Sequence, residues 1–154
     1  MKHKFPQILS ISSVILLLSA GFAAAQSTAA VDRLLAEDKA TVADAAYLIL
    51  AASNIVPETA AADKVMAALS ERKLLEGRAA EDPITLGEAS YLIMQTLGIK
   101  GGLLYTVFPG PRYAARELAY LRLVQGNTHP SRVVSGSEVM HILGGALELK
   151  GSVK

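Results

Sequence analysis

The stretch Thr85-Leu86-Gly87-Glu88-Ala89-Ser90-Tyr91-Leu92-Ile93 decides the fold of this chain, because its pattern occurs three times. In each copy a Thr or Ser is followed three residues later by an acid, and a largely apolar run comes next. The other copies are Thr41-Val42-Ala43-Asp44-Ala45-Ala46-Tyr47-Leu48-Ile49 and Ser135-Gly136-Ser137-Glu138-Val139-Met140-His141-Ile142-Leu143. The copies begin 44 residues (85 less 41) and 50 residues (135 less 85) apart, a spacing that indicates repeated supersecondary units. Such a repeat predicts a scaffold with a surface.

Each copy is typical of the start of a helix. The hydroxyl of the Thr or Ser is expected to accept a hydrogen bond from the backbone N–H three residues later, and the acid to bond back to the cap residue's own N–H. The predicted pairs are Thr41 with Asp44, Thr85 with Glu88, and Ser135 with Glu138. A cap of this kind contributes about 1 kcal/mol, and it explains both residue types without catalysis.

Apolar or small residues then recur at helical spacing on one face of each predicted helix. At offsets of four, seven and eight from the caps they are Ala45, Leu48, Ile49, Ala89, Leu92, Ile93, Val139, Ile142 and Leu143. Asn54 and Gly98 stand where a left-handed residue ends a helix. Tyr47, Tyr91 and His141 share one offset, which predicts one packing role with a polar partner near a common axis.

A further helix is predicted ahead of the second and third caps, over residues 61–76 and 112–125, each ended by a glycine. Polar turns follow at 78–83 and 127–132, and then short apolar pieces that predict minimal extended segments. The first unit is shorter, as is common for a terminal repeat. Residues 101–111, rich in Gly and Pro, predict an exposed loop.

These residues resemble the S-layer homology (SLH) repeat over about 31–149. In that family an aromatic-Ala start leads to a helix ending Gly-Leu-Ile-x-Gly, and a Pro-containing loop leads to Ile-Thr-Arg-Ala-Glu. The matching residues here are Tyr113-Ala114, Leu123-Val124-Gln125-Gly126, Pro130 and Val134-Ser135-x-x-Glu138, with Leu74-Leu75-Glu76-Gly77, Pro83 and Ile84-Thr85-x-x-Glu88 one unit earlier.

The resemblance implies a mainly α, pseudo-threefold bundle of three helix–turn–helix units, with the capped helices at its centre. It also implies non-covalent binding of cell-wall polysaccharide, often through a pyruvylated sugar held in grooves between repeats by the motif arginine. Val42, Leu86 and Gly136 occupy the arginine positions here. None of them offers the planar, charged donor that binds a carboxylate bidentately.

Three other arginines are candidates for a glycan or partner contact. Arg78 and Arg132 lie in the turns and Arg112 at a predicted helix start, near where grooves between units are expected. Arg78 and Arg132 are placed to replace a motif arginine from a shifted position. The alternative is that all three are solvated surface charges, which contribute little.

The N-terminus predicts export. Residues 1–25 combine a cationic start, an apolar stretch and Ala23-Ala24-Ala25, which indicate a bacterial signal peptide cut before Gln26; an uncleaved anchor is the alternative. The remaining 129 residues (154 less 25) suffice for one domain, 26–154, with units at about 29–54, 61–98 and 112–149. Without Lys2 and Lys4 they carry 13 basic and 14 acidic residues, unlike a nucleic-acid binder.

The sequence therefore predicts an exported, non-enzymatic protein of the periplasm or cell surface, with no cofactor or metal. Cysteine is absent, which excludes thiol catalysis and thiolate metal sites. Two hypotheses stay open: an interaction module that contacts an envelope protein, for example through the apolar residues 103–108, and a binding module for a cell-wall glycan. Membrane contact is expected only through the signal peptide before cleavage.

Overall fold

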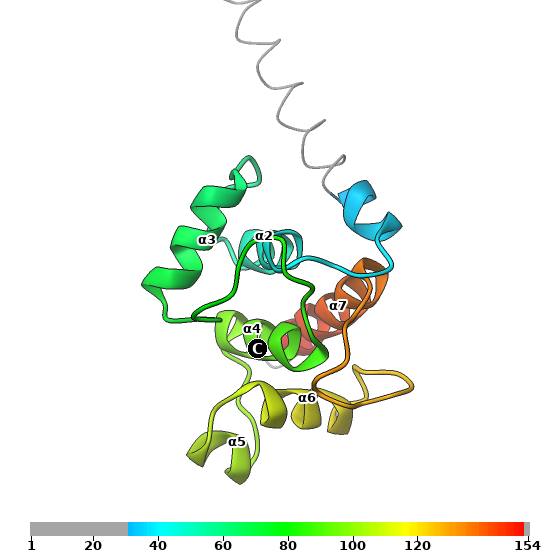
Figure 1. The fold of residues 1–154 in the computed structure, drawn as a ribbon. Coiled ribbons are helices and arrows are strands. Elements are labelled where there is room, and N and C mark those ends of the chain that lie inside the picture. Colours follow the sequence, from blue (N-terminus) through cyan, green and yellow to red (C-terminus); the bar gives the residue numbers. More distant parts are fainter. Residues whose placement is uncertain (1–30, 153–154) are drawn as a thin grey trace, which may run out of the picture.

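The computed structural model describes residues 31–152, and within them the chain is mainly helical, as the sequence predicts (Figure 1). The predicted signal peptide lies outside the described residues. After a short helical segment at 31–36 the elements are α2 (Val42–Ala52), α3 (Ala62–Glu71), α4 (Leu86–Leu97), α5 (Leu103–Val107), α6 (Pro111–Tyr120) and α7 (Gly136–Ser152). β pairing in this part of the chain consists of isolated bridges, Thr41 with Pro83 and Thr85 with Val133.

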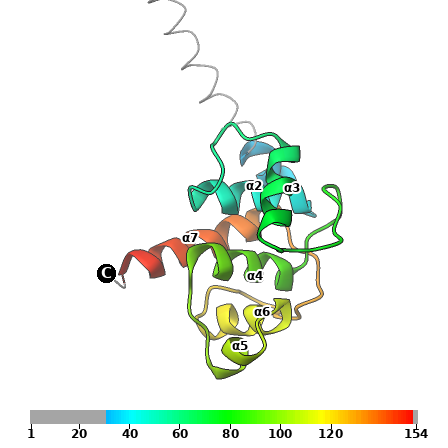
Figure 2. The same cartoon turned by 90° about the vertical axis from the view of Figure 1, so that its left-hand side faces the viewer.

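The three capped helices, α2, α4 and α7, contact one another, while α3 packs on α2 and α6 packs on α4. All nine residues at offsets of four, seven and eight from the caps are buried in one hydrophobic core. The periodicity of the sequence therefore corresponds to the faces that meet. Figure 2 shows α4 and α7 crossing side by side, with α6 on the far side of α4.

A ring of backbone hydrogen bonds joins the three segments that precede the capped helices. Ala40 N–H donates to Val134 O (2.9 Å), Val134 N–H to Ile84 O (3.2 Å), and Ile84 N–H to Ala40 O (2.9 Å). Each of these residues stands directly before a cap, and all three are buried. The extended pieces expected from the sequence thus meet at one point instead of forming a sheet.

The first N–H of each capped helix is also satisfied from another segment. Val42 N–H donates to Asp82 O (2.8 Å), Leu86 N–H to Arg132 O (2.8 Å), and Gly136 N–H to Glu37 O (3.1 Å). The first N–H groups of a helix lack partners inside the helix, so these bonds tie each start to the turn before another capped helix.

Two predictions about the connecting elements are wrong. α3 and α6 end at Glu71 and Tyr120, well before Gly77 and Gly126, because Lys73 (φ 53°) and Arg122 (φ 60°) already adopt left-handed conformations. The glycines continue the turn and do not end the helix. The loop predicted over 101–111 contains a short helix, α5, whose apolar residues gave no helical period long enough to recognise.

Candidate functional site

The start of α4 contains a complete capping box. Glu88 N–H donates to Thr85 Oγ1 (3.3 Å), while the Glu88 carboxylate accepts from Thr85 N–H (2.9 Å) and from the Thr85 hydroxyl (2.8 Å). At α2, the Asp44 N–H donates to Thr41 Oγ1 (3.2 Å), and the Asp44 carboxylate accepts from the Thr41 hydroxyl (2.8 Å) but not from the Thr41 N–H. The shorter Asp side chain bonds the cap hydroxyl and not its backbone.

The start of α7 differs, because its acid has another partner. Glu138 N–H donates to Ser135 Oγ (3.2 Å), but both Glu138 carboxylate oxygens accept from the guanidinium of Arg132. The expected return bond to the Ser135 backbone is therefore replaced by a bidentate ion pair. Such a pair fixes both side chains in one plane.

Each of the three capping acids is paired with an arginine. The arginines stand eight, seven and three residues before their caps, so no common spacing in the sequence marks them. The pairs are Arg33 with Asp44, Arg78 with Glu88 (3.0 Å from Nε to Oε1), and Arg132 with Glu138 (2.7 Å from Nη1 to Oε2). The acids therefore serve the helix start and an ion pair at once.

Arg132 is held by more than its carboxylate. Its Nε–H also donates to Asn127 O, which closes the turn 127–132. The hydrogen bonds to Glu138 raise the pKa of Arg132 above its ordinary value, so the guanidinium stays charged. Because the charge is matched by Glu138, this pair presents no net positive charge to an anion.

The other two candidate arginines do not join Arg132. Arg78 lies at the start of α4, where its Nη2 donates to Pro83 O (2.7 Å) and its Nη1 lies 3.7 Å from Asp82 Oδ2. Arg112 is exposed on α6 and forms no ion pair with any residue in 31–152. The three candidates therefore belong to separate parts of the surface.

The three positions that the resemblance aligns with an arginine are buried here. Val42 and Leu86 are fully buried, and a Cβ added to Gly136 would overlap the carbonyl oxygen of Leu34. A long cationic side chain at any of these positions would have to leave the core. Small or apolar residues at these positions thus agree with the packing of the helix starts.

A groove lies beside the first cap and another beside the third. The first, of about 250 Å³, is lined by Asp44 and Tyr47 together with the start of α3 at residues 60–62. At the second cap, the start of α6 lies over α4, where a Cβ on Gly87 would come within 3.0 Å of Pro111 O. A following helix therefore begins over the first cap, where it is α3, and over the second cap, where it is α6.

The groove beside the third cap, which we term the third cap groove, encloses about 380 Å³. Its lining residues are Gln125, Asn127, Arg132, Ser137, Glu138 and His141. They come from the turn before α7 and from α7 itself, and the structure describes no helix start over them. Every one of these side chains is polar, so the groove is rich in hydrogen-bond donors and acceptors.

His141 corrects one sequence prediction. It shares its offset with Tyr47 and Tyr91, but these residues face the surface beside the caps and not a common axis: His141 is exposed and the two tyrosines are half-buried. The Tyr47 hydroxyl donates to Glu58 O, and a ring nitrogen of His141 lies 3.1 Å from Gln125 Nε2. Burial, followed by the charge of Glu58, raises the pKa of Tyr47.

The sequence pointed to Arg132, Ser135 and Glu138 but missed Gln125, Asn127 and Ser137 as neighbours. Asn127 lies in a polar turn, and Ser137 stands one position before the capping acid. No spacing rule connects these residues, because the turn folds back on the start of α7. Residues 31–152 contain no group of three or more potential metal ligands.

Comparison with known proteins gives no relative: no family model, no curated protein and no solved structure matches this chain. Among the described residues no helix is both long enough and apolar enough to span a bilayer.

Proposed function

We propose that this chain is an exported, non-enzymatic SLH-like module of the cell envelope, built from three degenerate repeats around a pseudo-threefold axis. Two features support the repeat. The residues before the three caps form a cyclic set of hydrogen bonds, 40 to 134, 134 to 84 and 84 to 40. The first N–H of each capped helix also bonds the turn of the next unit in cyclic order, 42 to 82, 86 to 132 and 136 to 37.

We infer further that the third cap groove contacts the envelope component, and that this component is a neutral, hydroxyl-rich glycan. The observation that carries this inference is the set of polar side chains left without a covering helix beside α7. Side-chain amides, an imidazole and a carboxylate–guanidinium pair suit hydroxyl groups, each of which both donates and accepts. An anionic sugar is disfavoured, because it would compete with Glu138 for Arg132.

The test uses the predicted mature chain, 26–154, and purified cell-wall sacculi with or without their secondary polymer. We expect retention to depend on the polymer and to fall at least about tenfold, or about 1.4 kcal/mol, in the double variant Gln125→Ala, His141→Ala. This variant leaves the Arg132–Glu138 pair intact, so the helix start is preserved. Lys64→Ala, an exposed cation on α3, is the control and should bind as the parent does.

Salt distinguishes a neutral ligand from an anionic one. Contacts between exposed charges weaken as the screening length falls from about 10 Å at 0.1 M salt to about 3 Å at 1 M. A neutral glycan should be retained almost equally at both concentrations. Retention that ignores the polymer, or that the double variant leaves unchanged, would contradict the proposal. Specific retention of one envelope protein would favour the alternative of a protein partner.

A further inference from the structure

A pocket lies where α4 and α7 end, on the same side of the molecule (Figure 2). It encloses about 430 Å³, within the range of about 300–1,000 Å³ typical of ligand pockets. Its apolar lining comes from the end of α4 and the turn after it, the residue after α6, and the end of α7: Leu97, Ile99, Leu121 and Leu149. Its charged lining residues are Lys100 and Lys150, and we term it the lysine pocket.

The apolar side chains of the lysine pocket are recessed. Leu97 is buried, and Ile99, Leu121 and Leu149 are half-buried. A hollow of this kind receives an apolar group that enters it, whereas a membrane is bound by apolar side chains that project into it. Each methylene group that leaves water for the lining would add to the affinity. The pocket therefore suits a single apolar chain better than a bilayer.

Both charged residues of the pocket are cations, and no acid lines it. Lys100 and Lys150 are exposed, and neither forms an ion pair with any residue in 31–152. Two like charges beside one pocket disfavour each other, and an opposite charge placed near both favours their charged forms. The ligand that matches this end of the pocket is thus an anion.

The acids of the neighbouring helices do not neutralise these lysines. Glu148 stands two residues before Lys150, and side chains at that spacing on a helix do not face each other. Glu117 of α6 lines a different hollow, with Gly102 and Arg116. The positive charge at the lysine pocket therefore has no partner within the part of the chain that the structure describes.

A purely structural role at the helix ends accounts for less of what is seen. Cations stabilise the negative C-terminal end of a helix, and Lys150 lies in the last turn of α7. α4, however, ends without help from a lysine, because the N–H groups of Gly98 and Ile99 both donate to Met94 O. Support of two helix ends also does not require that both lysines border one apolar pocket.

We propose that the lysine pocket binds the monomeric anion of a fatty acid. The acyl chain lies against the apolar lining, and the carboxylate lies beside the two ammonium groups. A neutral glycan would leave both the lining and the charges unmatched. The site is separate from the third cap groove, since Ser137 and Lys150 are 13 residues (150 less 137) apart on α7, or about 20 Å.

NMR titration of the ¹⁵N-labelled chain 26–154 with decanoate, kept below the concentration at which decanoate forms micelles, tests the proposal. The backbone signals of Gly98, Ile99, Lys100 and Leu149 should shift and saturate, with a dissociation constant below about 1 mM. Octanoate, which lacks two methylene groups, should bind roughly 15-fold more weakly, because each buried methylene contributes about fourfold.

The charge is tested with the double variant Lys100→Gln, Lys150→Gln. It should raise the dissociation constant of decanoate at least about tenfold, while decylammonium, which has the same chain and the opposite charge, should bind no more weakly than to the parent. Both lysines are exposed, and circular dichroism checks that the variant is folded. Lys64→Gln, which removes an exposed cation on α3, should bind decanoate as the parent does.

The proposal is overturned if decanoate gives no saturable shift of these signals, if decylammonium binds the parent as tightly as decanoate does, or if the double variant binds decanoate as the parent does. Binding to phosphatidylglycerol vesicles without binding to monomeric decanoate would also overturn it and assign the lysines to a membrane surface. The glycan contact can fail separately: the variant Gln125→Ala, His141→Ala should bind decanoate as the parent does.

Discussion

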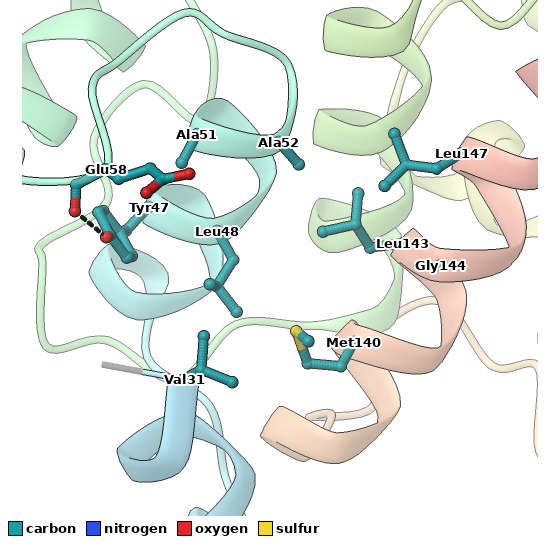
Figure 3. Close-up of a pocket in the computed structure, with 10 residues that line it drawn as sticks. All are labelled: Val31, Tyr47, Leu48, Ala51, Ala52, Glu58, Met140, Leu143, Gly144 and Leu147. Carbon is teal, nitrogen blue, oxygen red and sulfur yellow. Dashed lines mark hydrogen bonds between the residues drawn. The ribbon is translucent and has the colours of Figure 1, made fainter. Parts of the chain in front are cut away.

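Helices α4 and α7 begin with the same signal but have different surroundings. α4 is followed by α5 and α6, and α6 lies along it, so that eight of its residues are buried over a length of 12. α7 spans 17 residues and buries five of them, and two grooves lie beside it: the third cap groove and a groove of about 490 Å³ that α7 shares with α2 (Figure 3).

The difference follows from the place of each helix in the chain. A connection follows α2 and α4, and it returns the next helix, α3 or α6, to cover the start of the helix before it. α7 has no such follower within residues 31–152; the short segment 31–36 meets its first residue, Gly136, through Leu34, and Val31 lines the groove beside Met140. The two grooves therefore lie beside the one capped helix that no following helix covers within the described residues.

The largest expected effect on stability comes from matched core positions in α4 and α7, each eight residues after the cap. Ile93→Ala in α4 should reduce the free energy of unfolding by about 4 kcal/mol, because a closed cavity remains. Leu143→Ala in α7 should cost only about 2 kcal/mol, since Leu143 already lines an open groove. Urea unfolding of dilute protein measures both; equal losses would show that α7 is as fully packed as α4.

Two glycines sharpen the comparison within α7. Gly136→Ala should destabilise the protein by about 1–3 kcal/mol, because the new methyl group overlaps Leu34 and must displace residues 31–36. Gly144→Ala should instead stabilise it by up to about 1 kcal/mol, since a Cβ there meets no atom within 4 Å and Ala favours helix. Thermal unfolding of both variants tests the signs, and a stabilising Gly136→Ala would mean that 31–36 is not packed there.

The smallest effect concerns the caps. Thr85→Ala removes the acceptor for Glu88 N–H and breaks a complete capping box, so we expect a loss of about 1–2 kcal/mol. Ser135→Ala should cost about 0.5 kcal/mol, because it removes only the acceptor for Glu138 N–H and there is no return bond from the acid to lose. Chemical unfolding measures the free energy of unfolding of both variants. A larger loss for Ser135→Ala than for Thr85→Ala would contradict the assigned bonding.

The accuracy of the predictions depended on how local the signal was. The starts of α2, α4 and α7 follow from a hydroxyl, an acid and apolar periodicity within three turns. The sequence placed the three cap residues, and each observed helix begins at the next residue. The ends of α3 and α6 were placed too late, because Lys73 and Arg122 adopt left-handed conformations that their residue types do not favour. α5 was missed because five residues carry too little periodicity.

The candidate site was predicted only in part, for the same reason. Arg132 and Glu138 are close in sequence, and the caps could be read directly. The arginine partners of Asp44 and Glu88 stand further ahead of their caps than Arg132 does. Gln125 and His141, which are in contact, are 16 residues apart in the sequence. Such pairs depend on the path of a turn, which composition does not specify.

The sequence by itself determined that this chain is mainly helical, where its three capped helices begin and which faces they bury, because capping and periodicity act between residues within a few turns. Only the tertiary structure decided which cap is left uncovered, which acids bind which arginines, and where the two grooves beside α7 lie. Those features depend on how separate segments fill space around one another, and a residue's neighbours in the chain do not set its neighbours across a packed interface.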